Sequence, residues 1–129
     1  MSKDARNEDL DLPAEVRVKF RELVALLARQ GFGEHGPPRE TTFAQIEQFG
    51  HQAGRMVGRA VDAHLAEQHA AQFAGEASCP GCGAKRSPRE SPHDFPLQTQ
   101  DGEVTLREPS CHCPSCRRDF FPAAYSATD

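Results

Sequence analysis

The sequence reads Cys79-Pro80-Gly81-Cys82 and, after 30 intervening residues, Cys113-Pro114-Ser115-Cys116. Both stretches are Cys-Pro-x-Cys turns. Two residues between paired cysteines allow both sulfurs to reach one ion at about 2.3 Å, while proline and glycine favour a turn whose amides face the sulfurs. Because two such turns complete a tetrahedron, Zn²⁺ is the predicted cofactor and its predicted ligands are Cys79, Cys82, Cys113 and Cys116.

The predicted metal site is structural and the chain is not expected to be an enzyme, because four thiolates leave no coordination position for water. Metal binding would supply most of the folding free energy of this short segment, on the order of 10–16 kcal/mol by analogy with zinc-finger peptides. Cys111 and His112 are the alternatives to Cys113 as a ligand, although neither preserves the Cys-Pro-x-Cys turn. Otherwise Cys111 is expected to be a strand residue packed near the site.

The segment between the two turns is longer than the spacing of about 15–20 residues that is usual for paired Cys-x-x-Cys motifs. A β-hairpin accounts for the surplus, since it returns the chain to its start. Alternating residues at 97–100 and 103–107 flank Asp101-Gly102, a dipeptide typical of two-residue hairpin turns. We therefore predict a zinc ribbon over residues 78–122 with a β-hairpin inside it, followed by a tail at 123–129.

Residues 13–77 are predicted to be helical, with a first helix over about 13–30. Its apolar stripe has helical spacing and Gly31 is placed to end it; the stripe consists of Val16, Phe20, Leu23, Val24 and Leu27. A connection rich in glycine and proline follows. Thr42-Phe43-Ala44-Gln45 then matches a capping box, so a long helix is predicted over about 42–74.

The long helix carries two informative strips. One is an apolar seam typical of helix pairing or a short coiled coil: Ile46, Phe49, Ala53, Met56, Ala60 and Ala63. The other is the predicted helix-packing strip of Gly50, Gly54 and Gly58, where each glycine costs roughly 0.5–1 kcal/mol relative to alanine. Such a strip admits a close backbone, either the first helix folded back or the same helix of a second subunit. The predicted fold is thus α+β, an antiparallel helical hairpin followed by a zinc ribbon.

Composition limits the possible functions. The chain has 129 residues, 15 Lys and Arg against 19 Asp and Glu, and a formal net charge of −4, so bulk charge attracts neither DNA nor anionic lipid. Residues 1–12 are predicted to be a disordered tail. The longest apolar run, residues 23–28, excludes a signal peptide and a membrane span. A cytoplasmic location is therefore expected, where reduced cysteines serve as ligands.

Parts of the sequence resemble the N-terminal region of bacterial insertion-sequence transposases of the ISKra type. The resemblance covers roughly residues 42–122 and is carried by residues 42–47, 51–55, 79–83, 101–108 and 111–122. It implies a helical segment plus zinc ribbon that in the family precedes a ribonuclease-H-like catalytic domain, which cuts and joins DNA. Since Asp94, Asp101, Glu103 and Asp119 fall on ribbon loops, we expect a truncated or stand-alone form of the module, without strand transfer.

The expected function is therefore binding to transposon-end DNA or to a full-length transposase. The candidate phosphate contacts are Lys85, Arg86, Arg117 and Arg118. Residues 78–118 contain six basic and five acidic residues, so DNA affinity from local charge alone would be weak. The alternative is a protein-interaction element that forms a homodimer through the long helix, with a purely structural zinc site.

Overall fold

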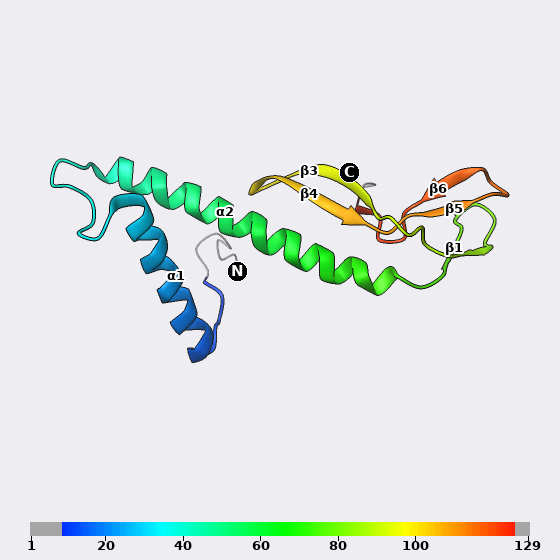
Figure 1. Ribbon diagram of the computed structural model, residues 1–129, viewed down its shortest axis with the longest axis horizontal. Coiled ribbons are helices and arrows are strands. Elements are labelled where there is room, and N and C mark those ends of the chain that lie inside the picture. Colours follow the sequence, from blue (N-terminus) through cyan, green and yellow to red (C-terminus); the bar gives the residue numbers. More distant parts are fainter. Residues whose placement is uncertain (1–8, 126–129) are drawn as a thin grey trace, which may run out of the picture. The chain divides into compact units, whose positions relative to one another are not determined.

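The computed structural model describes residues 9–125 and has an α+β architecture (Figure 1). Chain contacts divide it into two units, Met1–His51 and Gln52–Asp129. Of the predicted tail at 1–12, only residues 9–12 are among the described residues. Of the predicted tail at 123–129, only residues 123–125 are. Neither of the helices within residues 9–125 has an apolar stretch of the length that crossing a membrane requires.

Two helices and six short strands make up the described chain. The helices are α1 (Ala14–Phe32) and α2 (Phe43–Ala70), and a 3₁₀ turn, η2 (Ala71–Phe73), continues α2. The strands form three separate antiparallel pairs: β1 (Ala77–Ser78) with β2 (Lys85–Arg86), β3 (His93–Thr99) with β4 (Gly102–Glu108), and β5 (Cys111–Cys113) with β6 (Arg118–Phe120). A single bridge from Pro88 to Cys111 brings the segment after β2 beside β5.

The end of α1 differs from the prediction that Gly31 terminates the helix. The helix continues through Gly31 and Phe32 and ends at Gly33, whose φ of +86° lies in the left-handed region that glycine tolerates. Gly31 has a different function. A β-carbon there would overlap the ring of Phe49, which packs over this position and makes an edge contact with Phe32 at a centroid distance of 5.4 Å.

The start of α2 confirms the predicted capping box. The Gln45 amide donates to Thr42 Oγ1 at 3.2 Å, and the Thr42 amide donates to Gln45 Oε1 at 2.9 Å. These bonds satisfy two backbone donors that a helix N-terminus leaves without partners. At its other end the α-helix stops at Ala70 and the 3₁₀ turn runs to Phe73, one residue short of the predicted end at 74.

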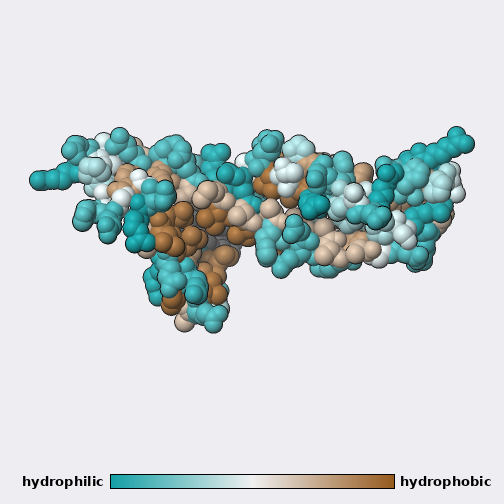
Figure 2. Space-filling model, viewed as in Figure 1, coloured by the Kyte–Doolittle hydropathy of each residue, from teal (hydrophilic) through white to brown (hydrophobic). Residues whose placement is uncertain are grey.

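The predicted antiparallel helical hairpin is not confirmed. No residue of α1 is buried, and large apolar side chains of its stripe, including Val16, Phe20 and Val24, are exposed. Figure 2 shows hydrophobic residues gathered over α1. The contact between α1 and the start of α2 is instead formed at their joined ends, by Phe32, Gly31 and Phe49.

The glycine strip of α2 also differs from expectation. Within residues 9–125, no atom outside the helix's own backbone lies within 4 Å of a β-carbon placed on Gly50 or Gly54. At Gly58 the close approach comes from a turn and not from another helix: a β-carbon would lie 2.7 Å from the carboxyl carbon of Asp101. Gly58 therefore makes room for the tip of the β3–β4 hairpin.

The β3–β4 hairpin is present, but its turn lies one residue earlier than the predicted Asp101-Gly102. Gly102 pairs with Thr99, so the two turn residues are Gln100 and Asp101. Three hydrogen bonds favour this register. Thr99 Oγ1 accepts from the Asp101 amide at 3.0 Å and donates to the Gly102 carbonyl at 2.7 Å, while Arg59 of α2 donates to the Asp101 carbonyl at 3.1 Å.

The C-terminal end of the described chain returns to α2. The Tyr125 hydroxyl donates to the Ala66 carbonyl at 3.0 Å, and its amide donates to the buried carboxylate of Glu108 at 2.8 Å. Val104, Leu106 and Glu108 are the inward-facing residues of β4. The hairpin and the ribbon are therefore attached to the second half of α2 at two points, through Arg59 and through Tyr125.

Candidate metal centre

The two Cys-Pro-x-Cys turns fold in the same way. In the first, the Gly83 amide donates to the Cys79 carbonyl at 2.8 Å; in the second, the Arg117 amide donates to the Cys113 carbonyl at 2.7 Å. Both closing residues have left-handed backbones, with φ of +78° at Gly83 and +58° at Arg117. Each turn thereby reverses the chain directly after its second cysteine and starts the strand that returns.

The turns bring four sulfurs together. The Sγ atoms of Cys79, Cys82, Cys113 and Cys116 all lie within 4.8 Å of one another. Two close pairs run between the turns, with 3.7 Å from Cys79 to Cys116 and 3.6 Å from Cys82 to Cys113. Because the sulfurs are so close together, this group of four could hold a metal ion. Among the residues described, no other cluster of histidine, cysteine or carboxylate side chains is arranged to do so.

Backbone amides stabilise negative charge on the sulfurs. The amides of Cys82 and Gly81 hold the pKa of Cys79 below its ordinary value, and the Gly81 amide lies 3.3 Å from Cys79 Sγ. The Cys116 amide lowers the pKa of Cys113 to about 6, with a further contribution from the Arg86 guanidinium. Hydrogen bonds with the sulfurs of Cys79 and then Cys82 raise the pKa of Cys116 to about 12. The expectation that the turn amides face the sulfurs is thus confirmed.

The fifth cysteine lies beside the cluster. Cys111 is fully buried with Cys79, Cys113 and Phe120, and burial raises the pKa of its thiol. Its Sγ lies 4.0 Å from the Arg86 carbonyl. His112 faces the other way, where its Nδ1 lies 2.8 Å from Asp119 Oδ1. Neither residue is part of the four-sulfur group, and Cys111 packs under it as a strand residue.

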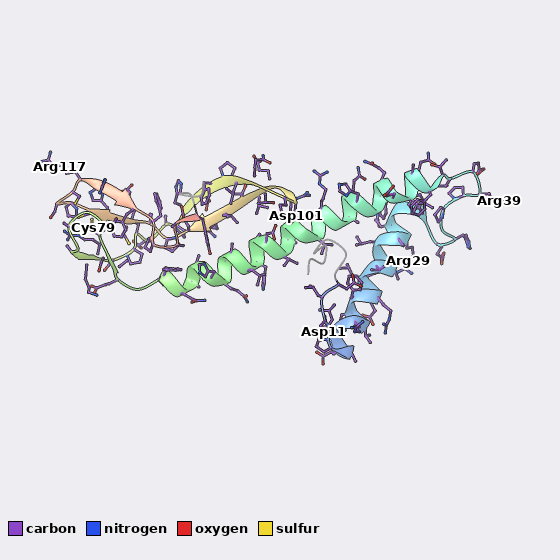
Figure 3. The ribbon with its side chains drawn as sticks, turned by 180° about the vertical axis from the view of Figure 1, so that it is seen from behind. Asp11, Arg29, Arg39, Cys79, Asp101 and Arg117 are labelled. Carbon is purple, nitrogen blue, oxygen red and sulfur yellow. The ribbon has the colours of Figure 1, made fainter. Side chains whose placement is uncertain are left out.

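The four predicted phosphate-binding cations occupy two kinds of position. Lys85 and Arg117 are exposed, and Figure 3 shows Arg117 at the outer tip of the β5–β6 hairpin. Arg86 is half-buried, whereas Arg118 is exposed like Lys85 and Arg117. Arg86 donates to Ser115 Oγ at 3.3 Å and contacts Cys113, while Arg118 Nη2 and Cys116 Sγ both approach Gly81.

Some contributors were not foreseen from the sequence. Ser115 was the variable position of its turn, yet it accepts a hydrogen bond from Arg86. Gly81 was expected to shape the turn, but its missing β-carbon also leaves room for Cys116 Sγ, which would stand 2.9 Å from it. The two turns have the same length and the same Cys-Pro-x-Cys pattern. This equality could have suggested contacts between the middle residues of the two turns, since two equal turns that bind one ion face each other.

The comparisons with known proteins identify no relative. The chain matches no protein-family model, no curated protein and no solved structure. The function must therefore be argued from the four-sulfur cluster and its surroundings.

Proposed function

We propose that residues 77–120 form a zinc ribbon whose Zn²⁺ is structural. The observation that carries the proposal is the spacing of the sulfurs. Zn–S bonds of about 2.3 Å in a tetrahedron place neighbouring sulfurs about 3.8 Å apart. The pairs Cys79–Cys116 and Cys82–Cys113 stand at 3.7 and 3.6 Å, so an ion at their centre requires little movement of the chain.

The same ligand set supports a role without catalysis. Four thiolates close the coordination sphere of Zn²⁺, and a hydrolytic zinc site needs one position for water. The ion would instead join β1–β2 to β5–β6, since each of these two-stranded sheets contributes one turn. Sheets of two or three residues per strand are too short to be stable alone, so the bound ion would supply their folding free energy.

Native mass spectrometry of the protein expressed with zinc tests this assignment. We expect one Zn²⁺ per chain. Cys82→Ser should abolish tight binding, whereas the matched control Cys111→Ser should keep one ion, because Cys111 lies outside the group of four. Two outcomes would contradict the proposed ligands. One is a wild-type protein without metal, and the other is loss of the metal in Cys111→Ser together with its retention in Cys82→Ser.

We further propose that the ribbon is a recognition module for DNA or for a transposase. This part rests on the resemblance of residues 42–122 to the N-terminal region of ISKra-type transposases, and on Lys85 and Arg117, which are exposed on the ribbon. The test is binding of a random-sequence duplex at increasing salt. Removing either cation should reduce the salt slope by about 1, while Arg39→Gln, outside the ribbon, should not. A binding curve insensitive to salt would contradict a phosphate-contacting role.

A second candidate function is self-association through the helices. The observation that favours it is the exposed apolar stripe of α1, in which Val16, Phe20 and Leu23 follow the four-three spacing of a two-stranded coiled coil. Most of the stability of a helix in a protein comes from packing of its apolar face, and this face is exposed in the single chain. Sedimentation equilibrium should then show a dimer that persists in high salt and that Phe20→Asp dissociates. A monomer at millimolar concentration would exclude it.

A further inference from the structure

Two arginines are placed close to the four sulfurs, and each comes from a different sheet. Four thiolates around a divalent ion carry a formal charge of −2, and such a charge in a partly buried site requires nearby cations or hydrogen-bond donors. Arg86 belongs to β2 and Arg118 to β6. The two residues therefore reach the centre from the two halves that the metal would join.

Arg86 lies over one edge of the cluster. Its guanidinium contacts Cys113 and, more weakly, Cys82, the two sulfurs that stand 3.6 Å apart. Its Nη2 donates to Ser115 Oγ at 3.3 Å, and its Nε is buried without a hydrogen-bond partner. A guanidinium that has given up water at Nε is stabilised by negative charge beside it, and the two thiolates are the charges that its contacts provide.

Arg118 lies at the opposite edge. A β-carbon placed on Gly81 would stand 2.9 Å from Cys116 Sγ, 3.0 Å from Arg118 Nη2 and 3.7 Å from Cys79 Sγ. One nitrogen of this exposed guanidinium and the two sulfurs therefore border the same position, which is open because residue 81 has no side chain. Cys79 and Cys116 are the second close pair, at 3.7 Å.

Each close pair of sulfurs thus has its own arginine. We propose that Arg86 and Arg118 are the two counter-charges of the metal–thiolate centre, which offset its charge of −2 and slow the release of the ion. The inference rests on the proposed zinc site. It also reassigns Arg86, because a half-buried guanidinium placed against thiolates contributes little to a phosphate contact, which leaves the exposed cations Lys85, Arg117 and Arg118 for that role among the four predicted.

The test compares variants of two arginines with variants of two neighbouring cations. Arg86→Gln and Arg118→Gln each remove a charge beside the sulfurs, while Lys85→Gln and Arg117→Gln remove exposed charges one residue away. The readout is the rate of Zn²⁺ release to a chromogenic chelator, in the range where the rate does not depend on chelator concentration. We expect each arginine variant to accelerate release about 10-fold and each control to stay within about twofold, in line with other groups that support metal ligands. Equal rates in all four variants would overturn the proposal.

The absorption spectrum of the Co²⁺-substituted protein separates this proposal from the zinc site itself. If wild-type protein lacks the tetrathiolate spectrum, the zinc site is wrong; if the spectrum is present and the rates are unchanged, only the arginine assignment is wrong. If the Arg86→Gln variant lacks the tetrathiolate spectrum, the Arg86→Lys variant shows whether the site needs the positive charge of Arg86 or the shape of its guanidinium. Recovery of the spectrum and of slow release by lysine supports a counter-charge, and failure of lysine to recover them overturns it.

Discussion

Gly83 and Arg117 occupy the same position in two copies of one turn, yet only one of them is glycine. Both have a left-handed backbone directly after the second cysteine of the turn. A side chain in this conformation costs about 1 kcal/mol, because its β-carbon crowds the carbonyl oxygen. The second turn therefore carries a strain that the first avoids.

We expect Gly83→Ala to destabilise the zinc-loaded protein by about 1 kcal/mol through the backbone alone, since no atom lies within 4 Å of the new β-carbon. Arg117→Gly should stabilise it by a somewhat smaller amount, because glycine also gains entropy in the unfolded chain. Urea unfolding of the zinc-loaded variants measures both. If both substitutions changed the free energy of unfolding in the same direction, the left-handed backbone would not be what determines their effects on stability.

At the level of single residues, the sequence predicts ligands better than their surroundings. The four cysteines could be assigned because the chemistry of a Cys-x-x-Cys pair depends on a spacing of only two residues. The contacts of Arg86 and Arg118 depend on where β2 and β6 meet the opposite turn, 29 residues away for Arg86 and Ser115 and 37 for Arg118 and Gly81. Sequence spacing therefore indicated that four cations accompany the turns, but not which two of them face the sulfurs.

The elements of the fold show a similar division between local and distant causes. The capping box of α2 was predicted correctly because Thr42 and Gln45 are only three residues apart and bond directly to each other. The end of α1 and the turn of the β3–β4 hairpin were each placed wrongly by one or two residues. In both cases a side chain distant in sequence intervenes, Phe49 over Gly31 and Arg59 at the Asp101 carbonyl.

The junction between α2 and the hairpin tip also holds two carboxyl groups close together. Asp101 raises the pKa of Asp62, first through a hydrogen bond to its carboxyl group and further through burial and charge repulsion. A raised pKa in the folded state means that this group favours folding below its unfolded pKa of about 3.9, and that the contribution is lost as pH rises through the folded pKa. At neutral pH the pair therefore opposes the docking of the hairpin.

Asp62→Asn should accordingly stabilise the protein at pH 7, by no more than about 1 kcal/mol because the site is close to solvent. The gain should shrink in high salt and disappear below about pH 4, where wild-type Asp62 is protonated. Thermal unfolding across this pH range provides the measurement. Asp94→Asn is the matched control, since Asp94 pairs with Arg107 at 3.2 Å and its loss should not stabilise; equal gains in both variants would argue against the Asp62–Asp101 repulsion.

For the whole molecule, composition and motif order predicted an α+β chain with its helices before its cysteines, and the structure agrees. The helical hairpin was not confirmed for a physical reason. An apolar stripe shows which face of a helix avoids water, but Val16 and Phe20 carry no information about which surface covers that face. The tie between Tyr125 and α2 was equally unpredictable, because it joins residues 59 positions apart through a single hydroxyl.

Removal of the metal should divide the second unit into a labile and a persistent part. The β1–β2 and β5–β6 pairs consist of two or three residues per strand and would be held by the proposed ion, whereas β3–β4 pairs over seven residues and is attached to α2 through Arg59. Hydrogen exchange after chelation should therefore show large losses of protection at the first two pairs and smaller losses at the hairpin. Uniform loss across all three would mean that the second unit unfolds as one body.

The pairing of the sulfurs also determines what happens to a chain that meets an oxidant after its ion has gone. Two pairs of sulfurs stand close across the turns, Cys79 with Cys116 at 3.7 Å and Cys82 with Cys113 at 3.6 Å. Disulfides formed from this arrangement would cross between the turns and not close within them. Two such disulfides would link the same strands that the proposed ion would join, so oxidation would preserve the fold of the ribbon. The metal could not bind again until a reductant restored the thiols.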